Sequence, residues 1–296
     1  MQILFVGSGA FGLPVLKHLV ETQRCVGVVT GVDKPVGRNR KLSGTPVGIY
    51  SESNNLPLIK TIDINDEQSL DSFDFDVMVV IAFGQKIKSK LLSKYRAINL
   101  HASLLPRWRG ASPINAAIMN GDSLTGLSVI ALENRIDAGP ILGQIEIEID
   151  PEETAGALHD RLSLLGPQLL DEVLLGDSDF SGMLQDENSA TYSGKLSRKD
   201  ALLDLSASAT QVSQKIRGLS PWPGCHLLIG GVDCKILSAV AKSGMGEPGE
   251  ILADGTIATG IGSIEVLQIK PAGGSEMTWK DFCNGRSIKE GEICKV

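Results

Sequence analysis

The stretch "ILFVGSGAFGLPVL", residues 3 to 16, decides the fold of the N-terminal part of the chain. An apolar run leads into a glycine-rich turn, and the apolar residues after the turn recur at helical spacing. The pattern predicts a strand over 2–6, a helix over 10–22 and a second strand over 25–30. A strand–helix–strand opening is typical of an α/β domain with a Rossmann-like, mostly parallel sheet.

The turn, Gly7-Ser8-Gly9-Ala10-Phe11-Gly12, matches the fingerprint of dinucleotide-binding proteins. Its glycines permit a tight turn and close approach of a pyrophosphate to a helix N-terminus, but packing alone can require the same glycines. A dinucleotide site also needs an acidic residue near the end of the second strand, and Thr30 stands there. An NAD-dependent oxidoreductase is therefore a weak alternative.

The next segments extend the sheet. Residues 76–83, "DVMVVIAF", form a continuous apolar run that is typical of a parallel strand covered on both faces. A shorter strand is expected at about 95–100, followed by an antiparallel pair over 125–133 and 141–149. A helix over 151–175 is expected to carry Glu152 and Glu153 in its first turn, where the helix dipole favours acidic side chains.

The C-terminal third has a different composition. Residues 177–200 are polar and read as a surface linker, a helix is expected at about 208–217, and closely spaced apolar segments with glycine turns begin at 225. These short segments predict a small OB-like β-barrel. The expected organisation is an α/β domain over 1–183, a linker over 184–203 and a barrel domain over 204–296.

Composition and charge limit the function classes. The 296 residues have the balance of a soluble globular protein, without a leader segment or an apolar stretch long enough for a membrane span. We therefore expect a cytoplasmic location and no membrane partner. The five cysteines are scattered, which indicates reduced thiols and no metal site. The net charge of −7 disfavours a generic polyanion binder such as a DNA-binding protein.

Asn99 and His101 lie two residues apart at a strand end, so their side chains share one face of the strand. Ligands of open α/β sheets gather at such ends. Histidine is the side chain that exchanges protons near neutral pH, although a histidine in a loop can also be purely structural. Asp137, in "NRIDAGP", is either an ordinary turn residue or the carboxylate that orients the histidine ring and stabilises its protonated form.

The segment "SLLPRWRGASPI" after Asn99-x-His101, together with Asp137-Ala138-Gly139, resembles the formyltransferase family that uses 10-formyltetrahydrofolate. The resemblance extends over nearly the whole chain, through "DKPVGRNRKL", "VMVVIAFGQKI", "YSGKLSRKDALLDL" and "SPWPG". Two positions depart from the family pattern. The family usually opens Gly-Thr-Pro-x-Phe-Ala where this chain has Gly7 to Gly12, and Lys88 replaces a common proline.

The resemblance implies that the formyl group of 10-formyltetrahydrofolate, bound as co-substrate without a metal, passes to the α-amine of methionine on initiator tRNA. Asn99 would donate to the oxyanion, and His101 would move protons beside Asp137. Folate would contact Phe83, Gly84, Ser103, Leu104, Leu105, Pro106, Asn134, Ile136 and Gly139. The tRNA would contact Lys34, Arg38, Arg40, Lys41, Arg107, Arg109, Lys195, Arg198 and Lys199, with Lys215 and Arg217 extending that surface.

Solvated loops explain any single one of these cations equally well. A formyltransferase acting on a small amine, such as a nucleotide sugar, and a non-catalytic RNA-binding module built on the barrel remain alternatives. The RNA-binding module leaves Asn99, His101 and Asp137 without a role. We expect a monomer.

Overall fold

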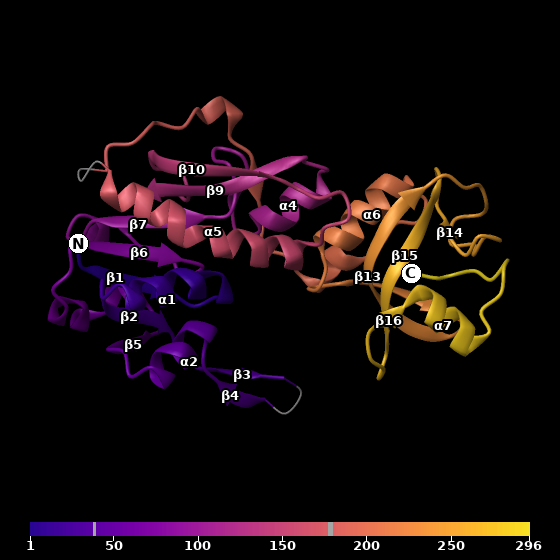
Figure 1. Ribbon diagram of the computed structural model, residues 1–296, viewed down its shortest axis with the longest axis horizontal. Coiled ribbons are helices and arrows are strands. Elements are labelled where there is room, and N and C mark those ends of the chain that lie inside the picture. The colour runs from indigo at the N-terminus through magenta and orange to yellow at the C-terminus, as the bar shows by residue number, and fades with distance from the viewer. Residues whose placement is uncertain (38–39, 177–179) are drawn as a thin grey trace. The chain divides into compact units, whose positions relative to one another are not determined.

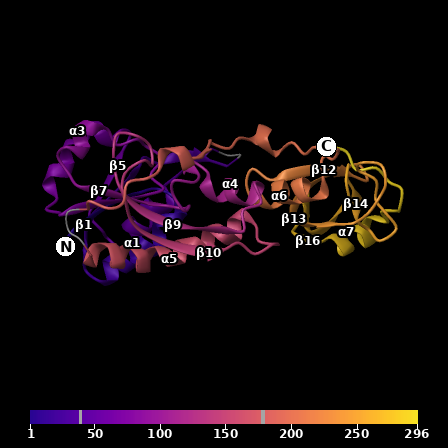
Figure 2. The same cartoon turned by 90° about the horizontal axis from the view of Figure 1, so that it is seen from above.

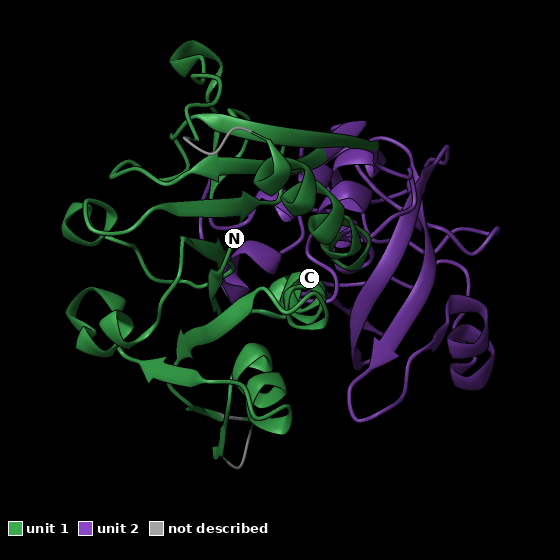
Figure 3. Cartoon of the chain, turned by 60° about the vertical axis from the view of Figure 1, so that its left-hand side comes forward, with its two compact units in different colours: residues 1–110, 126–147, 159–192 green, residues 111–125, 148–158, 193–296 purple. Residues whose placement is uncertain are grey.

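The computed structural model describes residues 1–37, 40–176 and 180–296 (Figure 1). The chain forms two compact units, each discontinuous in sequence (Figure 3). Unit 1 consists of Met1–Gly110, Gly126–Ile147 and His159–Tyr192, and unit 2 of Ala111–Thr125, Glu148–Leu158 and Ser193–Val296. The reaction residues proposed from the sequence all belong to unit 1.

Unit 1 is built on a seven-stranded sheet in the order β10-β9-β7-β6-β1-β2-β5. Five of its strands are parallel: β1 (Ile3–Gly7), β2 (Cys25–Gly31), β5 (Leu58–Thr61), β6 (Val77–Ile81) and β7 (Ala97–His101). β9 (Leu124–Ala131) runs antiparallel to β7, and β10 (Ile141–Glu148) lies at the edge. The mostly parallel sheet predicted from the sequence is confirmed.

The burial of each strand's residues depends on the position of that strand in the sheet. Every residue of β1 and β6 is buried, as expected for central strands covered on both faces, whereas most of the outer strand β10 alternates between half-buried and exposed residues. The helices α1 (Leu13–Glu21) and α5 (Ala155–Leu175) lie along one side of the sheet, and α3 (Ser89–Leu92) lies on the other (Figure 2). Hydrophobic packing on both faces therefore holds the parallel strands in place, together with the edge of the sheet where their carboxyl ends lie.

The glycines of the first turn serve this packing. A Cβ on Gly7 would lie 2.7 Å from the Ile81 carbonyl oxygen, and a Cβ on Gly12 would lie 2.9 Å from the Phe5 ring. Both positions therefore exclude larger residues, Gly7 by close approach of the backbone and Gly12 by close approach of the Phe5 ring. The turn is tied to the neighbouring strand, because the Gly9 N–H donates to the Ala82 carbonyl at 3.1 Å.

The helix expected from residue 151 begins at Ala155. Its start is set by Thr154, whose hydroxyl accepts a hydrogen bond from the Ala157 N–H. Glu152 and Glu153 belong to the preceding turn and not to the first turn of the helix, so that prediction was wrong. Threonine is a favoured N-cap, and this signal outweighs the acidic pair.

Several short elements were not predicted. The basic stretch after β2 is the hairpin of β3 (Lys34–Val36) and β4 (Lys41–Ser43), followed by α2 (Pro46–Ser53). The segment after His101 pairs β8 (Arg109–Gly110) with β11 (Tyr192–Ser193). In unit 2, α4 (Pro113–Met119) precedes β9.

Unit 2 contains the helix α6 (Ala209–Gly218), which begins with a capping box between Ser208 and Gln211, and a five-stranded sheet. The strands are β12 (Cys225–Ile229), β13 (Val232–Lys242), β14 (Ile257–Ala258), β15 (Ser263–Pro271) and β16 (Met277–Thr278), all paired antiparallel, and α7 (Trp279–Arg286) follows. The sheet curls into a half-barrel around one hydrophobic core, in agreement with the predicted barrel-type domain.

Candidate active site

Asn99 and His101 lie at the carboxyl end of β7. In the sheet, Asn99 is level with Val80 on the parallel strand β6 and with Ile130 on the antiparallel strand β9. Residues two apart on a strand point to the same face, and both side chains indeed reach one third residue, Asp137. The sheet therefore presents an amide and an imidazole side by side at the edge where ligands of such folds bind.

Asp137 lies in the connection between β9 and β10, with its backbone in the left-handed region at φ 50°. One carboxylate oxygen, Oδ1, accepts from Asn99 Nδ2 at 3.4 Å. The other, Oδ2, accepts from the Gly110 N–H at 2.8 Å and lies 3.6 Å from His101 Nδ1. The side chains of His101 and Asp137 are only 7% and 12% exposed, so water screens their interaction weakly.

The ring of His101 is oriented by a group that the sequence did not reveal. Its Nε2 lies 2.9 Å from the carbonyl oxygen of Trp108, which can only accept, so Nε2 carries a proton and donates it. Nδ1 is then the ring nitrogen that faces the Asp137 carboxylate. The main chain around Trp108 is itself held, because the Trp108 N–H donates to the Thr191 hydroxyl at 2.9 Å.

The residues expected at the folate site differ in burial. Phe83, Ser103 and Leu105 are buried, and Ser103 and Leu105 hold the loop through hydrogen bonds with Arg107, Ser128 and Gln144. Gly139 is buried as well, Leu104 and Pro106 are half-buried, and Gly84, Asn134 and Ile136 are exposed. The buried members shape the loop, and the exposed ones beside Asp137 are accessible to a ligand.

The cations expected to contact tRNA are also divided. Lys34, Arg40, Lys41 and Arg107 in unit 1, and Lys195, Arg198 and Lys199 in unit 2, are exposed, while Arg38 lies outside the described residues. The Arg107 guanidinium lies over the Trp108 ring, 4.5 Å from its centroid. Two expectations need correction, because Arg109 and Arg217 are 1% and 8% exposed and their guanidinium groups point into the protein.

Arg109 is the centre of a polar network. Its guanidinium donates to Gln185 Oε1 and to both carboxylate oxygens of Glu187 at 2.9 to 3.2 Å. Glu187 also pairs with the exposed Arg135 at 2.9 Å. Hydrogen bonds from Arg109 and then Arg135 lower the pKa of Glu187 from 4.5 to about 2. The buried Arg109 guanidinium is thus paired with the Glu187 carboxylate, which remains ionised at acidic pH.

The network predicts how stability depends on pH. Because the pKa of Glu187 is depressed in the folded protein, its contribution is complete above pH 4.5 and is lost as the pH falls towards about 2. Glu187→Gln is therefore expected to lower the free energy of unfolding at pH 7, by an amount that shrinks below pH 4.5. Urea unfolding at pH 7, 4 and 3 measures this, with the exposed Glu290→Gln as control. A difference that stays constant with pH would contradict the assignment.

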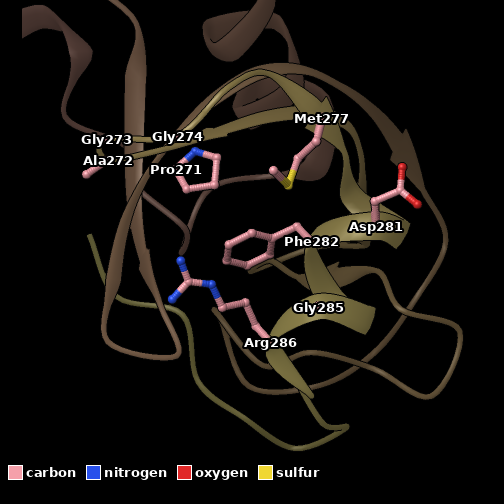
Figure 4. Close-up of a pocket in the computed structure, with 9 residues that line it drawn as sticks. All are labelled: Pro271, Ala272, Gly273, Gly274, Met277, Asp281, Phe282, Gly285 and Arg286. Atoms are coloured by element: carbon pink, nitrogen blue, oxygen red, sulfur yellow. The ribbon is translucent and has the colours of Figure 1, made fainter.

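A cavity of about 380 Å³ lies in unit 2 between the turn after β15 and the helix α7 (Figure 4). Pro271, Met277 and Phe282 form its apolar part, with Asp281 and Arg286 at its margin. None of the residues proposed for the reaction lines it. It is therefore separate from the Asn99, His101 and Asp137 cluster.

A metal site, a membrane span and a dinucleotide site find no support among the residues that the structure describes. No group of three or more His, Cys, Asp or Glu side chains there is arranged to hold a metal. Nor does a helix in those ranges have the length and apolar character to cross a membrane. At the end of β2, Thr30 is buried and bonded to the hydroxyls of Ser8 and Thr45, so an acidic ribose partner is missing there.

Known proteins match both parts of the chain. The family "Formyl transferase" matches residues 1–174, and "Formyl transferase, C-terminal domain" matches residues 195–287. The structure of HypX from Aquifex aeolicus in complex with tetrahydrofolic acid shares the fold, with a TM-score of 0.66 and 16% identity over 100% of this chain and 51% of HypX. An N-formyltransferase from Helicobacter canadensis, with a TM-score of 0.66 and 16% identity, covers 94% of this chain and 100% of its own. Fold and family matches together define the class: the chain is a formyl transferase.

Full-length relatives narrow the class further. The methionyl-tRNA formyltransferase of Methylococcus capsulatus is 35% identical over 97% of this chain and 98% of its own length. That of Halorhodospira halophila is 37% identical over 98% of both chains. The chain belongs to the methionyl-tRNA formyltransferase family.

Proposed function

We propose that this protein transfers the formyl group of 10-formyltetrahydrofolate to the α-amino group of methionine on initiator tRNA. The observation that carries the proposal is the convergence of Asn99 and His101 on Asp137 at the carboxyl end of β7. The formyl donor follows from membership in the family. The tRNA substrate follows from that membership together with the exposed basic hairpin β3–β4. Because both substrates belong to translation and one-carbon metabolism, we place the enzyme in the cytoplasm.

Each residue has a distinct role in the proposed reaction. The amine nitrogen attacks the formyl carbon, which gives a tetrahedral intermediate with a negatively charged oxygen. The Asn99 amide donates a hydrogen bond to that oxygen, and such a donor is worth about 3 kcal/mol in other enzymes. His101 takes a proton from the attacking amine through Nδ1 and returns it to N10 of the folate as the carbon–nitrogen bond breaks. Asp137 stabilises the protonated imidazole.

The folate would lie against the exposed edge of the Asp137 loop. Asn134 and Ile136 are exposed there, Gly84 after β6 is exposed as well, and the apolar side chain of Ile136 is 62% exposed. An exposed isoleucine beside a carboxylate suits an aromatic ring system that carries polar edges. We propose these residues as the contacts of the pterin, with the buried Phe83, Ser103 and Leu105 supporting the segments around them.

The direct test is a formylation assay. The protein, 10-formyltetrahydrofolate and Met-tRNA are expected to give formyl-Met-tRNA, detected by acid gel electrophoresis, with no requirement for added metal. We also propose that the protein is a monomer. Its chain would comprise a catalytic domain (1–183), a linker (184–203) and a tRNA-binding domain (204–296). Formylation of a nucleotide-linked amino sugar but not of Met-tRNA would favour the small-amine alternative.

The basic hairpin distinguishes these two acceptors. Replacing both Arg40 and Lys41 by alanine is expected to raise KM for Met-tRNA several-fold and leave kcat unchanged, because cations that bind phosphates contribute to binding rather than to the chemical step. The slope of log KM against log salt should fall by about one for each phosphate that the variant no longer binds. The exposed Lys90→Ala in α3 is the matched control. A fall in kcat at unchanged KM would contradict this role.

A further inference from the structure

Gln185 is an inward-pointing residue on an otherwise exposed segment. From Ser181 to Ser189, all of them described, every residue is exposed except Gln185, which is half-buried. The segment is attached to the sheet two residues earlier, where Met183 and Ile141 exchange main-chain hydrogen bonds at 2.8 Å. This attachment places the Gln185 amide at the root of the loop that carries Asp137.

The Gln185 amide uses all of its hydrogen-bonding capacity. Its Oε1 accepts from Nε and Nη2 of Arg109 at 3.0 and 2.9 Å. Its Nε2 donates to the carbonyl oxygens of Asp137 and Gly139 at 2.9 and 2.7 Å. A guanidinium only donates and a carbonyl only accepts, so the amide has one orientation that satisfies all four hydrogen bonds.

These hydrogen bonds close a ring through the reaction residue. Arg109 binds Gln185, Gln185 binds the main chain of Asp137, and the Asp137 carboxylate accepts from the N–H of Gly110, the next residue in the chain after Arg109. The ring holds both the main chain and the side chain of Asp137. The buried Arg109 guanidinium anchors it, since it also pairs with the carboxylate of Glu187.

The loop has features that require such support. Asp137 has a positive φ of 50°, which is an uncommon conformation for a residue with a side chain. Two residues later the chain crosses so closely that a Cβ on Gly139 would lie 1.8 Å from the Ala131 carbonyl oxygen. Strained main chain persists at functional sites only where the surrounding structure determines it.

We propose that Gln185 is a positioning residue for formyl transfer, which acts by fixing the Asp137 loop so that the carboxylate faces both Asn99 and His101. The proposal rests on the proposed function, because it gives Asp137 a role in the reaction. It assigns a task in the reaction to a residue 48 positions away from Asp137 in the chain.

Gln185→Glu is the sharpest variant. Its carboxylate keeps a charge-assisted hydrogen bond with Arg109, but it has no N–H donor and places an oxygen against the carbonyls of Asp137 and Gly139. We expect a kcat about 10- to 100-fold lower, since small misplacements of reacting groups have effects of this size. Gln185→Ala, which removes all four hydrogen bonds, should be at least as slow. The neighbouring Leu184→Ala, at a side chain that is 79% exposed, is the matched control and should keep wild-type kcat.

Two measurements separate positioning from a general loss of structure. In an Asp137→Asn background, Gln185→Glu should lower kcat by less than about threefold more, because the two residues act as a unit. The pH–rate profile of Gln185→Glu should resemble that of Asp137→Asn rather than that of the wild type. Multiplicative losses in the double variant, or a wild-type kcat for Gln185→Glu, would overturn the proposal.

A readout without activity tests the link between Gln185 and the Asp137 loop separately from the reaction. The Gly110 N–H bonds to the Asp137 carboxylate, so its hydrogen exchange, followed by NMR, should accelerate in Gln185→Glu and remain unchanged in Leu184→Ala. Unchanged exchange at Gly110 in Gln185→Glu would refute positioning even in an active enzyme. Accelerated exchange in a protein that does not formylate Met-tRNA would support the link between Gln185 and the loop and refute the proposed function.

Discussion

Replacing His101 by alanine is expected to lower kcat for formylation of Met-tRNA by about 10²- to 10⁴-fold, with smaller changes in KM. This is the usual contribution of a positioned proton-transfer group. The geometry supports the role, because the Trp108 carbonyl occupies Nε2 and Nδ1 faces the Asp137 carboxylate. Single-turnover kinetics at saturating tRNA and folate would measure the chemical step directly.

Two further variants make this result interpretable. His101→Gln can keep an N–H donor towards the Trp108 carbonyl but cannot exchange a proton near neutral pH, so it should be nearly as slow as His101→Ala. His226→Ala is the matched control, because that histidine lies in unit 2 and pairs with Asp233 on the surface. Substantial activity in His101→Gln would show that the ring orients the loop and does not carry the proton.

The sequence could predict the side chains of this site because periodicity and turn chemistry identify them. Asn99 and His101 share a face by strand spacing, and Asp137 occupies a turn between two apolar strands. The sheet order brings the two segments together, as β9 pairs directly with β7. The half-barrel and the parallel sheet likewise follow from short alternating segments and continuous apolar runs.

The main-chain partners could not be predicted. The Trp108 carbonyl and the Gly110 N–H belong to backbone groups that nearly every residue possesses, so no letter of the sequence marks them. The burial of the Arg109 side chain could not be predicted either. Charge indicated a surface residue, yet Gln185 and Glu187, more than 70 positions along the chain, supply the partners that allow its burial. Such pairings exist only after the chain has folded.

Asp137→Asn is expected to lower kcat by about 10²- to 10⁴-fold as well, although the side chain keeps its size. In the wild type both carboxylate oxygens accept hydrogen bonds, Oδ1 from Asn99 and Oδ2 from Gly110. An amide has only one acceptor oxygen, so its NH2 group must face either the Asn99 NH2 or the Gly110 N–H. Either orientation breaks one of these hydrogen bonds. The substitution also removes the negative charge beside His101.

The same variant tests whether the three side chains act as a unit. If Asp137 works through His101, the double variant His101→Ala, Asp137→Asn should be only slightly slower than the slower single variant, because either change alone already abolishes their interaction. Asp74→Asn, at an exposed position, controls for the change of charge and should keep full activity. Thermal unfolding checks that each variant is folded. Losses that multiply in the double variant would mean that Asp137 contributes independently of the histidine, for example through the Asn99 amide alone.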